Sequence, residues 1–137
     1  MDYRAWALLS ALFAGLTAIL AKKGVEDVSS NLALAIRVLV VTAAAWAIVF
    51  ARHEAKLTGI SGKTWTYLAL SGLATGASWL CYFRALKSGP VSQVAPIDKL
   101  SFVIAVVLGF VVLKEKVSMN TVYGCVLIVA GVAVTLR

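Results

Sequence analysis

The sequence predicts an all-α membrane protein with five transmembrane helices. Hydrophobic residues make up 61% of its 137 residues and charged residues only 14%. The mean hydropathy is +0.93, and the charged residues lie mostly in short clusters between long apolar runs. A soluble domain of this length needs a large polar exterior, so this composition disfavours an enzyme that works in bulk water.

Five apolar segments are long enough to cross a bilayer, whose hydrocarbon core of about 30 Å requires roughly 20 helical residues. They cover about 5–21, 32–50, 65–86, 94–113 and 120–136. The first is interpreted as a span rather than a cleavable signal peptide, because Lys22 and Lys23 follow it directly. The runs are continuous, whereas a β-barrel needs alternating segments. Short connections make consecutive helices antiparallel, so residues 1–137 are expected to form a single transmembrane domain.

Pro96 is expected in the first turn of the fourth helix, where no backbone N–H donor is required.

Other functional classes lack support in the sequence. The net charge of +7 could indicate a nucleic-acid partner, but the Lys and Arg residues flank apolar runs, as membrane topology requires. Cys81 and Cys125 lie inside apolar runs and form no metal-binding spacing, and His53 is the one histidine. We therefore expect no enzyme, no metal, no cofactor and no nucleic acid, and a lipid bilayer as the surroundings.

Positive charges are divided almost evenly between the two sides of the membrane. The side of the N-terminus carries Arg4, Arg52, Lys56, Lys63, Lys114 and Lys116, and the other side carries Lys22, Lys23, Arg84, Lys87 and Arg137. An imbalance of Lys and Arg sets orientation, so this distribution permits insertion in either direction. Two interpretations stay open: dual topology with antiparallel pairing, or a fixed topology with the N-terminus inside.

Four charged residues form a predicted cluster within the spans, at similar depth near one side: Arg37, Arg84, Asp98 and Lys99. A charge at a helix centre costs about 2.5–3.5 kcal/mol, so these residues should face protein or water. Asp98 is the expected partner of Arg37, Arg84 or Lys99. The alternative is a structural ion pair, or snorkelling of the long basic side chains to the interface.

Polar and aromatic side chains follow one face of the third span, where Ser71, Thr75, Ser78 and Tyr82 are spaced four, three and four residues apart. A weaker stripe follows the first span. Together with the start of the fourth span they predict a substrate cavity. Its candidate residues are Ser10, Thr17, Thr75, Ser78, Trp79, Tyr82, Asp98, Lys99 and Phe102. The alternative is that the hydroxyls bond to helix carbonyls and the aromatic rings only pack.

Small residues indicate where helices could approach closely. Gly72 and Gly76 form a GxxxG pair in the third span, and Gly124 and Gly131 lie seven residues apart in the last. Such spacings place both glycines on one helix face, which suits helix packing within the chain or across a dimer.

The segment 86–137 resembles the second part of an EamA-type domain of the drug/metabolite transporter superfamily. The resemblance rests on Gly89 and Pro96 at the start of the fourth helix, Leu113 and Glu115 at its end, and Gly124 and Gly131 in the last helix. Arg37 also stands where the second helix of the family usually bears an Arg. Lys114 departs from the pattern, because a small residue, often Gly, is commoner there.

The resemblance implies that this chain is one half of a ten-helix transporter with inverted repeats. In the family, the first, third and fourth helices of each half line the substrate path. Two copies inserted oppositely would rebuild the carrier, which implies a secondary transporter of a small metabolite or an amphipathic or cationic compound, working as an antiparallel homodimer. The alternative is a non-transporting membrane subunit, or a half-transporter that needs a different partner chain. We expect a multi-pass protein of a bacterial or archaeal cytoplasmic membrane.

Overall fold

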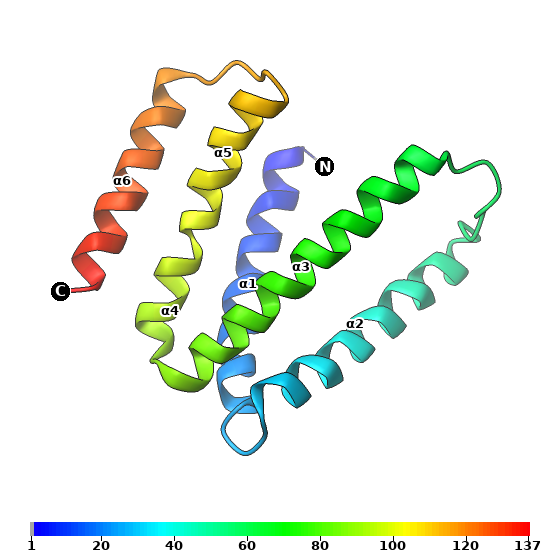
Figure 1. Cartoon of the computed structure of the whole chain (residues 1–137), viewed down its shortest axis with the longest axis horizontal. Helices are drawn as coiled ribbons and strands as arrows, with labels where there is room; N and C mark the ends of the chain where they lie inside the picture. Colours follow the sequence, from blue (N-terminus) through cyan, green and yellow to red (C-terminus); the bar gives the residue numbers. More distant parts are fainter. Residues whose placement is uncertain (1) are drawn as a thin grey trace. The chain divides into compact units, whose positions relative to one another are not determined.

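The computed structural model describes residues 2–137, and this part of the chain is helical without any β-strand (Figure 1). The elements are α1 (Tyr3–Gly24), α2 (Ser30–Ala51), α3 (Gly62–Ser88), α4 (Val91–Asp98), α5 (Leu100–Val112) and α6 (Met119–Thr135). The predicted all-α fold of a polytopic membrane protein is confirmed. The chain packs as two units, of which the first ends at Lys87 and the second is Ser88–Arg137.

Three helices begin directly after a serine whose hydroxyl accepts a hydrogen bond from the backbone of the first turn. These bonds join Ser29 Oγ to Leu32 N at 3.3 Å, Ser61 Oγ to Thr64 N at 3.2 Å and Ser118 Oγ to Thr121 N at 3.2 Å. The first N–H groups of a helix have no partner within it, and a serine side chain supplies one. The apolar runs therefore start as helices at defined residues.

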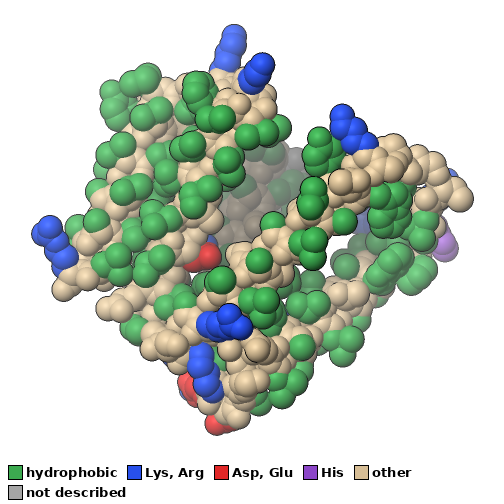
Figure 2. Space-filling view, viewed as in Figure 1, with side chains coloured by type: hydrophobic (Ala, Val, Ile, Leu, Met, Phe, Trp, Pro, Cys, Tyr) green, Lys and Arg blue, Asp and Glu red, His purple; other side chains and the backbone are tan. Residues whose placement is uncertain are grey.

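Three segments of the described chain have the length and composition of a membrane span: α1, α2 and the stretch Val91–Val112 that α4 and α5 form together. Each has 22 residues, which reach about 33 Å at the helical rise of 1.5 Å per residue. Their apolar side chains point outwards, and Leu8 and Leu39 are 73% and 72% exposed. Figure 2 shows hydrophobic side chains along the visible helices and Lys and Arg side chains mostly at helix ends. Lipid is the medium that such a surface requires.

The other two expected spans differ from these three. α6 is apolar but has 17 residues, and α3 has 27 residues but carries the polar stripe of Ser and Thr side chains. Their insertion in the membrane stays a prediction.

The expected fourth helix is divided at Lys99, and Pro96 is the reason. The helix begins at Val91, so Pro96 lies inside α4 rather than in its first turn as the sequence indicated. Its ring has no N–H to donate to the carbonyl of Ser92 and crowds that carbonyl. The chain tightens after it, with Lys99 N donating to Pro96 O at 3.0 Å, and α5 starts at Leu100. The break places Asp98 and Lys99 at a helix junction.

Two lysines join the end of α3 to the end of α1 and the connection that follows. Lys22 Nζ donates to Leu86 O at 2.7 Å. Lys87 Nζ donates to the carbonyl oxygens of Val25 at 2.7 Å, Glu26 at 3.1 Å and Val28 at 2.8 Å. Beneath them Val25 and Leu86 are almost fully buried, with 1% and 0% exposed. These carbonyl groups lie in the last turn of α3 and in the α1–α2 connection, where no helical N–H can reach them, so the lysines supply the donors. The bonds also fix the start of α2 against α3.

The connection from α5 to α6 shows why a glycine would suit position 114, where this chain has a lysine. Lys114 has φ 55°, the left-handed conformation that favours glycine. Leu113 N and Glu115 N both donate to Gly109 O, at 3.1 and 3.2 Å. A Cβ at Gly109 would lie 3.2 Å from Glu115 Oε2, so this glycine lets the carboxylate lie close to the helix.

We expect Lys87→Met to lower the free energy of unfolding by about 1–3 kcal/mol, because the variant keeps the apolar stem but loses three charge-assisted hydrogen bonds. Thermal unfolding in detergent measures the change. Lys23→Met is the matched control, since it removes a positive charge from the same connection and its ion pair with Glu26 spans 3.9 Å at an exposed site. Equal unfolding midpoints for the two variants would contradict the assigned role of Lys87.

We expect Lys114→Gly to raise the free energy of unfolding by about 1 kcal/mol, because glycine adopts a positive φ without steric cost. The same unfolding assay applies. Lys116→Gly removes an equal charge two residues away and should give no gain. A loss of stability in Lys114→Gly would show that the Lys114 side chain outweighs its backbone cost.

Candidate binding site in the first unit

Arg37 of α2 lies against two aromatic rings of α3. Its guanidinium carbon is 4.3 Å from the ring centroid of Trp79 and 5.5 Å from that of Phe83. The two rings are four residues apart and therefore share one face of α3. A guanidinium over an aromatic face gains about 0.5–2 kcal/mol, more where water is excluded. This stacking holds the charged group at a fixed place inside an apolar environment.

The first unit offers Arg37 no acidic partner. Its acids are Asp2, Glu26, Asp27 and Glu54, and none of them forms an ion pair with Arg37 in residues 2–87. A contact with an aromatic ring does not use the N–H donors of a guanidinium, which lie in its plane and can still bind a ligand. The site thus presents a positive charge with donors in a planar fork.

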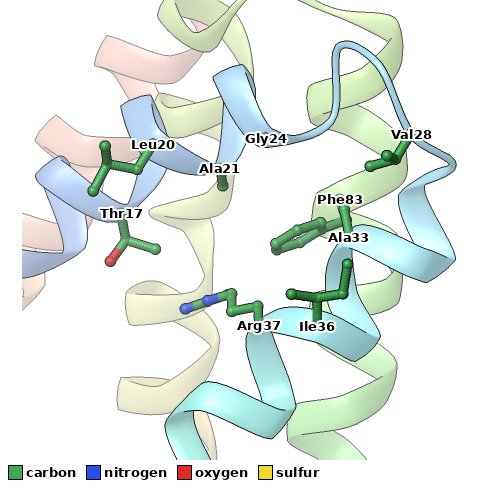
Figure 3. A pocket seen from close by; sticks show the side chains of 9 residues that line it. All are labelled: Thr17, Leu20, Ala21, Gly24, Val28, Ala33, Ile36, Arg37 and Phe83. Carbon is green, nitrogen blue, oxygen red and sulfur yellow. The ribbon is translucent and has the colours of Figure 1, made fainter.

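The guanidinium borders a cavity of about 420 Å³ between the three helices of this unit. The cavity is lined by Thr17, Leu20, Ala21, Gly24, Val28, Ala33, Ile36, Arg37 and Phe83. Figure 3 shows Arg37 reaching from α2 towards the side of the cavity where Thr17 lies, with Phe83 and Ile36 on the other side. The volume falls within the range of small-molecule sites, which are mostly apolar with a few polar groups that orient the ligand.

The structure brings some of the predicted residues together here. Thr17 lines the cavity and Trp79 contacts the Arg37 guanidinium. Phe83, which is 2% exposed, was not predicted as a site residue. Its spacing of four residues from Trp79 was the sequence signal that could have identified it.

The remaining candidates of the first unit lie outside the cavity lining. Thr75 Oγ1 donates to Ser71 O at 2.9 Å, which is the helix-carbonyl bond expected under the alternative interpretation. Ser10 and Ser78 are exposed, and Tyr82 is half-buried. Arg84 is exposed as well, and the binding roles of these residues stay predictions.

Asp98 and Lys99 meet at the junction of α4 and α5 in the second unit. Lys99 Nζ lies 3.6 Å from Asp98 Oδ2, and their side chains are 59% and 38% exposed. Of the three partners expected for Asp98, the structure pairs it with Lys99. Pairing of Asp98 with Arg37 or Arg84 stays a prediction. The interruption between the two helices is the single residue Lys99, whose N–H donates to Pro96 O and whose carbonyl accepts from Phe102 N. Phe102, in the first turn of α5, is 47% exposed.

The four predicted packing glycines make no close contact within the described chain. A Cβ added at Gly72, Gly76, Gly124 or Gly131 would meet no atom within 4 Å. Their helix faces are therefore open, and their role in a dimer interface stays a prediction. Residues 2–137 contain no group of three or more His, Cys, Asp or Glu side chains that could hold a metal ion.

Comparison with known proteins places this apolar helical chain among transporters. A relative from Sinorhizobium sp., named "Uncharacterized transporter in cobO 3'region", is 50% identical over 131 residues, which cover 95% of this chain and 93% of the relative. No solved structure matches the chain significantly. The model of the EamA-like transporter family matches residues 4–137. The chain is therefore a multi-pass membrane protein and belongs to the EamA-like transporter family.

Proposed function

We propose that the protein is a secondary transporter that moves a small metabolite by alternating access, as an antiparallel homodimer. The observation that carries the proposal is the family match over 4–137 in a helical chain with three segments long and apolar enough to span a membrane. Family transporters combine two such halves of opposite orientation. A single short chain can satisfy this requirement by pairing with an inverted copy of itself.

Two further observations support the antiparallel pairing. Lys and Arg residues are divided almost evenly between the two sides, so insertion has little preferred direction. The relative at 50% identity is matched over 93% of its length, so it is also of about half the length of a ten-helix carrier. A bacterial cytoplasmic membrane is the proposed location, in keeping with the source of that relative.

The other candidate is a membrane subunit that does not transport by itself, because a different chain supplies the second half. The open faces at the four glycines suit either partner equally. Purified protein in liposomes separates the two candidates, because a homodimeric carrier moves solute without any other chain.

Asp98 is the proposed coupling residue. It lies at the α4–α5 junction, where it is ion-paired with Lys99 at 3.6 Å and 38% exposed. Coupling requires a group whose occupancy changes between the two facing states, and a carboxylate that can release its lysine to bind a proton or cation meets that requirement.

Antiparallel pairing predicts complementation between two oppositely biased variants. Glu26→Lys with Asp27→Lys adds positive charge to one side, and Glu54→Lys with Thr58→Lys adds it to the other; all four positions are exposed. Each double variant alone should insert in one direction and lose transport, and co-expression should restore it. Full activity of either variant alone, with all its copies in one orientation, would contradict the antiparallel dimer.

Asp98→Asn should abolish accumulation against a proton gradient while solute counterflow continues, because asparagine cannot titrate. Both assays are run on the same liposomes, with Lys99→Met as the control for loss of the ion pair alone. If Asp98 only neutralises a base, counterflow should fall together with the yield of folded protein. Undiminished gradient-driven uptake by a folded Asp98→Asn dimer would rule out the coupling role.

A further inference from the structure

We infer that the cavity of the first unit binds an organic anion with an apolar body, and that Arg37 is the residue that binds the anionic group. This inference rests on the proposed transport function and narrows its substrate class to small apolar carboxylates. It also makes Arg37 a binding residue rather than only a member of an intramembrane charge cluster.

The charge of the site determines the sign of the ligand. Arg37 is the positively charged residue of the cavity lining, and its guanidinium carbon lies over the rings of Trp79 at 4.3 Å and Phe83 at 5.5 Å. No acid of residues 2–87 is paired with it. A cationic ligand would be repelled here, and a neutral ligand would leave the positive charge without a counter-ion from this unit in an apolar environment, where a single charge is costly. An anion removes that cost.

The geometry of the guanidinium determines the chemistry of the anion. The guanidinium lies over the rings of Trp79 and Phe83, and its N–H donors form a planar fork, which matches the two oxygens of a carboxylate. The Thr17 hydroxyl lines the same cavity and offers one further donor or acceptor for orientation.

The remaining lining determines the body of the ligand. Apart from Arg37 and Thr17, the cavity presents aliphatic side chains, glycine and the Phe83 ring. A volume of about 420 Å³ suits an aromatic or branched aliphatic acid, and it is small for a phospholipid with two acyl chains. The side chain of Val28 belongs to this lining, and its backbone carbonyl is held by Lys87 at 2.8 Å, so the cavity wall is fixed before a ligand arrives.

The test measures binding of three isosteric probes by equilibrium dialysis with the purified full chain in an uncharged detergent at neutral pH. The probes are phenylpropionate, phenylpropionamide and phenylpropylamine. We expect the carboxylate to bind about tenfold or more tightly than the amide, since a charge-assisted hydrogen bond distinguishes them, and the amine to bind least. Equal binding of the three probes by the wild-type protein would overturn the inference without any variant.

Arg37→Gln should abolish the preference for the carboxylate over the amide, and Arg37→Lys should retain part of it because the charge remains without the planar fork. Arg52→Gln is the matched control, because it removes the same group from the end of the same helix and should keep the full preference. A folded Arg37→Gln variant that still prefers the carboxylate would overturn the inference.

Nanodiscs distinguish a metabolite site from a lipid site. Phenylpropionate should bind equally in phosphatidylcholine nanodiscs with and without phosphatidylglycerol. Loss of binding when phosphatidylglycerol is present would assign Arg37 to an anionic lipid headgroup and overturn the inference.

Counterflow in liposomes separates this inference from the proposed function. Arg37-dependent binding of phenylpropionate without counterflow of any solute would contradict the transporter and leave the anion site in place. Counterflow of neutral or cationic solutes, without Arg37-dependent carboxylate binding, would contradict the anion site and leave the transporter in place.

Discussion

The hydrogen bonds from Lys87 to three carbonyl groups of the α1–α2 connection are the constraint on which the geometry of the first unit depends. Trp79, Phe83 and Lys87 are spaced four residues apart and share one face of α3. The end of this face holds the connection, and the two turns before it hold the guanidinium of Arg37. Because the connection leads directly into α2, fixing it also fixes where Arg37 meets the rings and where the cavity wall lies.

Both units contain polar and charged groups whose partners are side chains or backbone groups of the same unit. Lys22 and Lys87 supply donors to carbonyl groups that helix geometry leaves free, and Arg37 is stabilised by aromatic rings in place of an acid. In the second unit the interruption after Pro96 lies beside the ion pair of Asp98 and Lys99. Irregular backbone at membrane depth is tolerated only next to protein or water, so this junction is expected to face protein or water rather than lipid.

Composition and run length were enough to predict the helices, because hydrophobicity over some 20 residues is a property of the sequence alone. The charge inside the second span and the spacing of polar and aromatic residues in the first and third spans were enough to mark Arg37, Thr17 and Trp79 as candidates. Phe83 and the hydrogen bonds of Lys87 were missed because both depend on contacts between segments far apart in the sequence. From the sequence alone, Lys87 was counted only among the positive charges that flank the spans. The break at Lys99 was missed for a smaller reason: α4 begins at Val91, three residues earlier than expected, which moves Pro96 from the first turn into the helix interior.

We propose that copies of this chain inserted in opposite directions pair to form the carrier. The sidedness of a single cysteine tests this pairing. In a chain with Cys81→Ser and Cys125→Ser, Leu136→Cys places a thiol at the end of α6, where Leu136 is 57% exposed, without changing any charge. A membrane-impermeant maleimide applied to sealed vesicles of one orientation should label about half of the molecules, and permeabilisation should expose the other half. Labelling of all molecules, or of none before permeabilisation, would show a single orientation and contradict the antiparallel carrier.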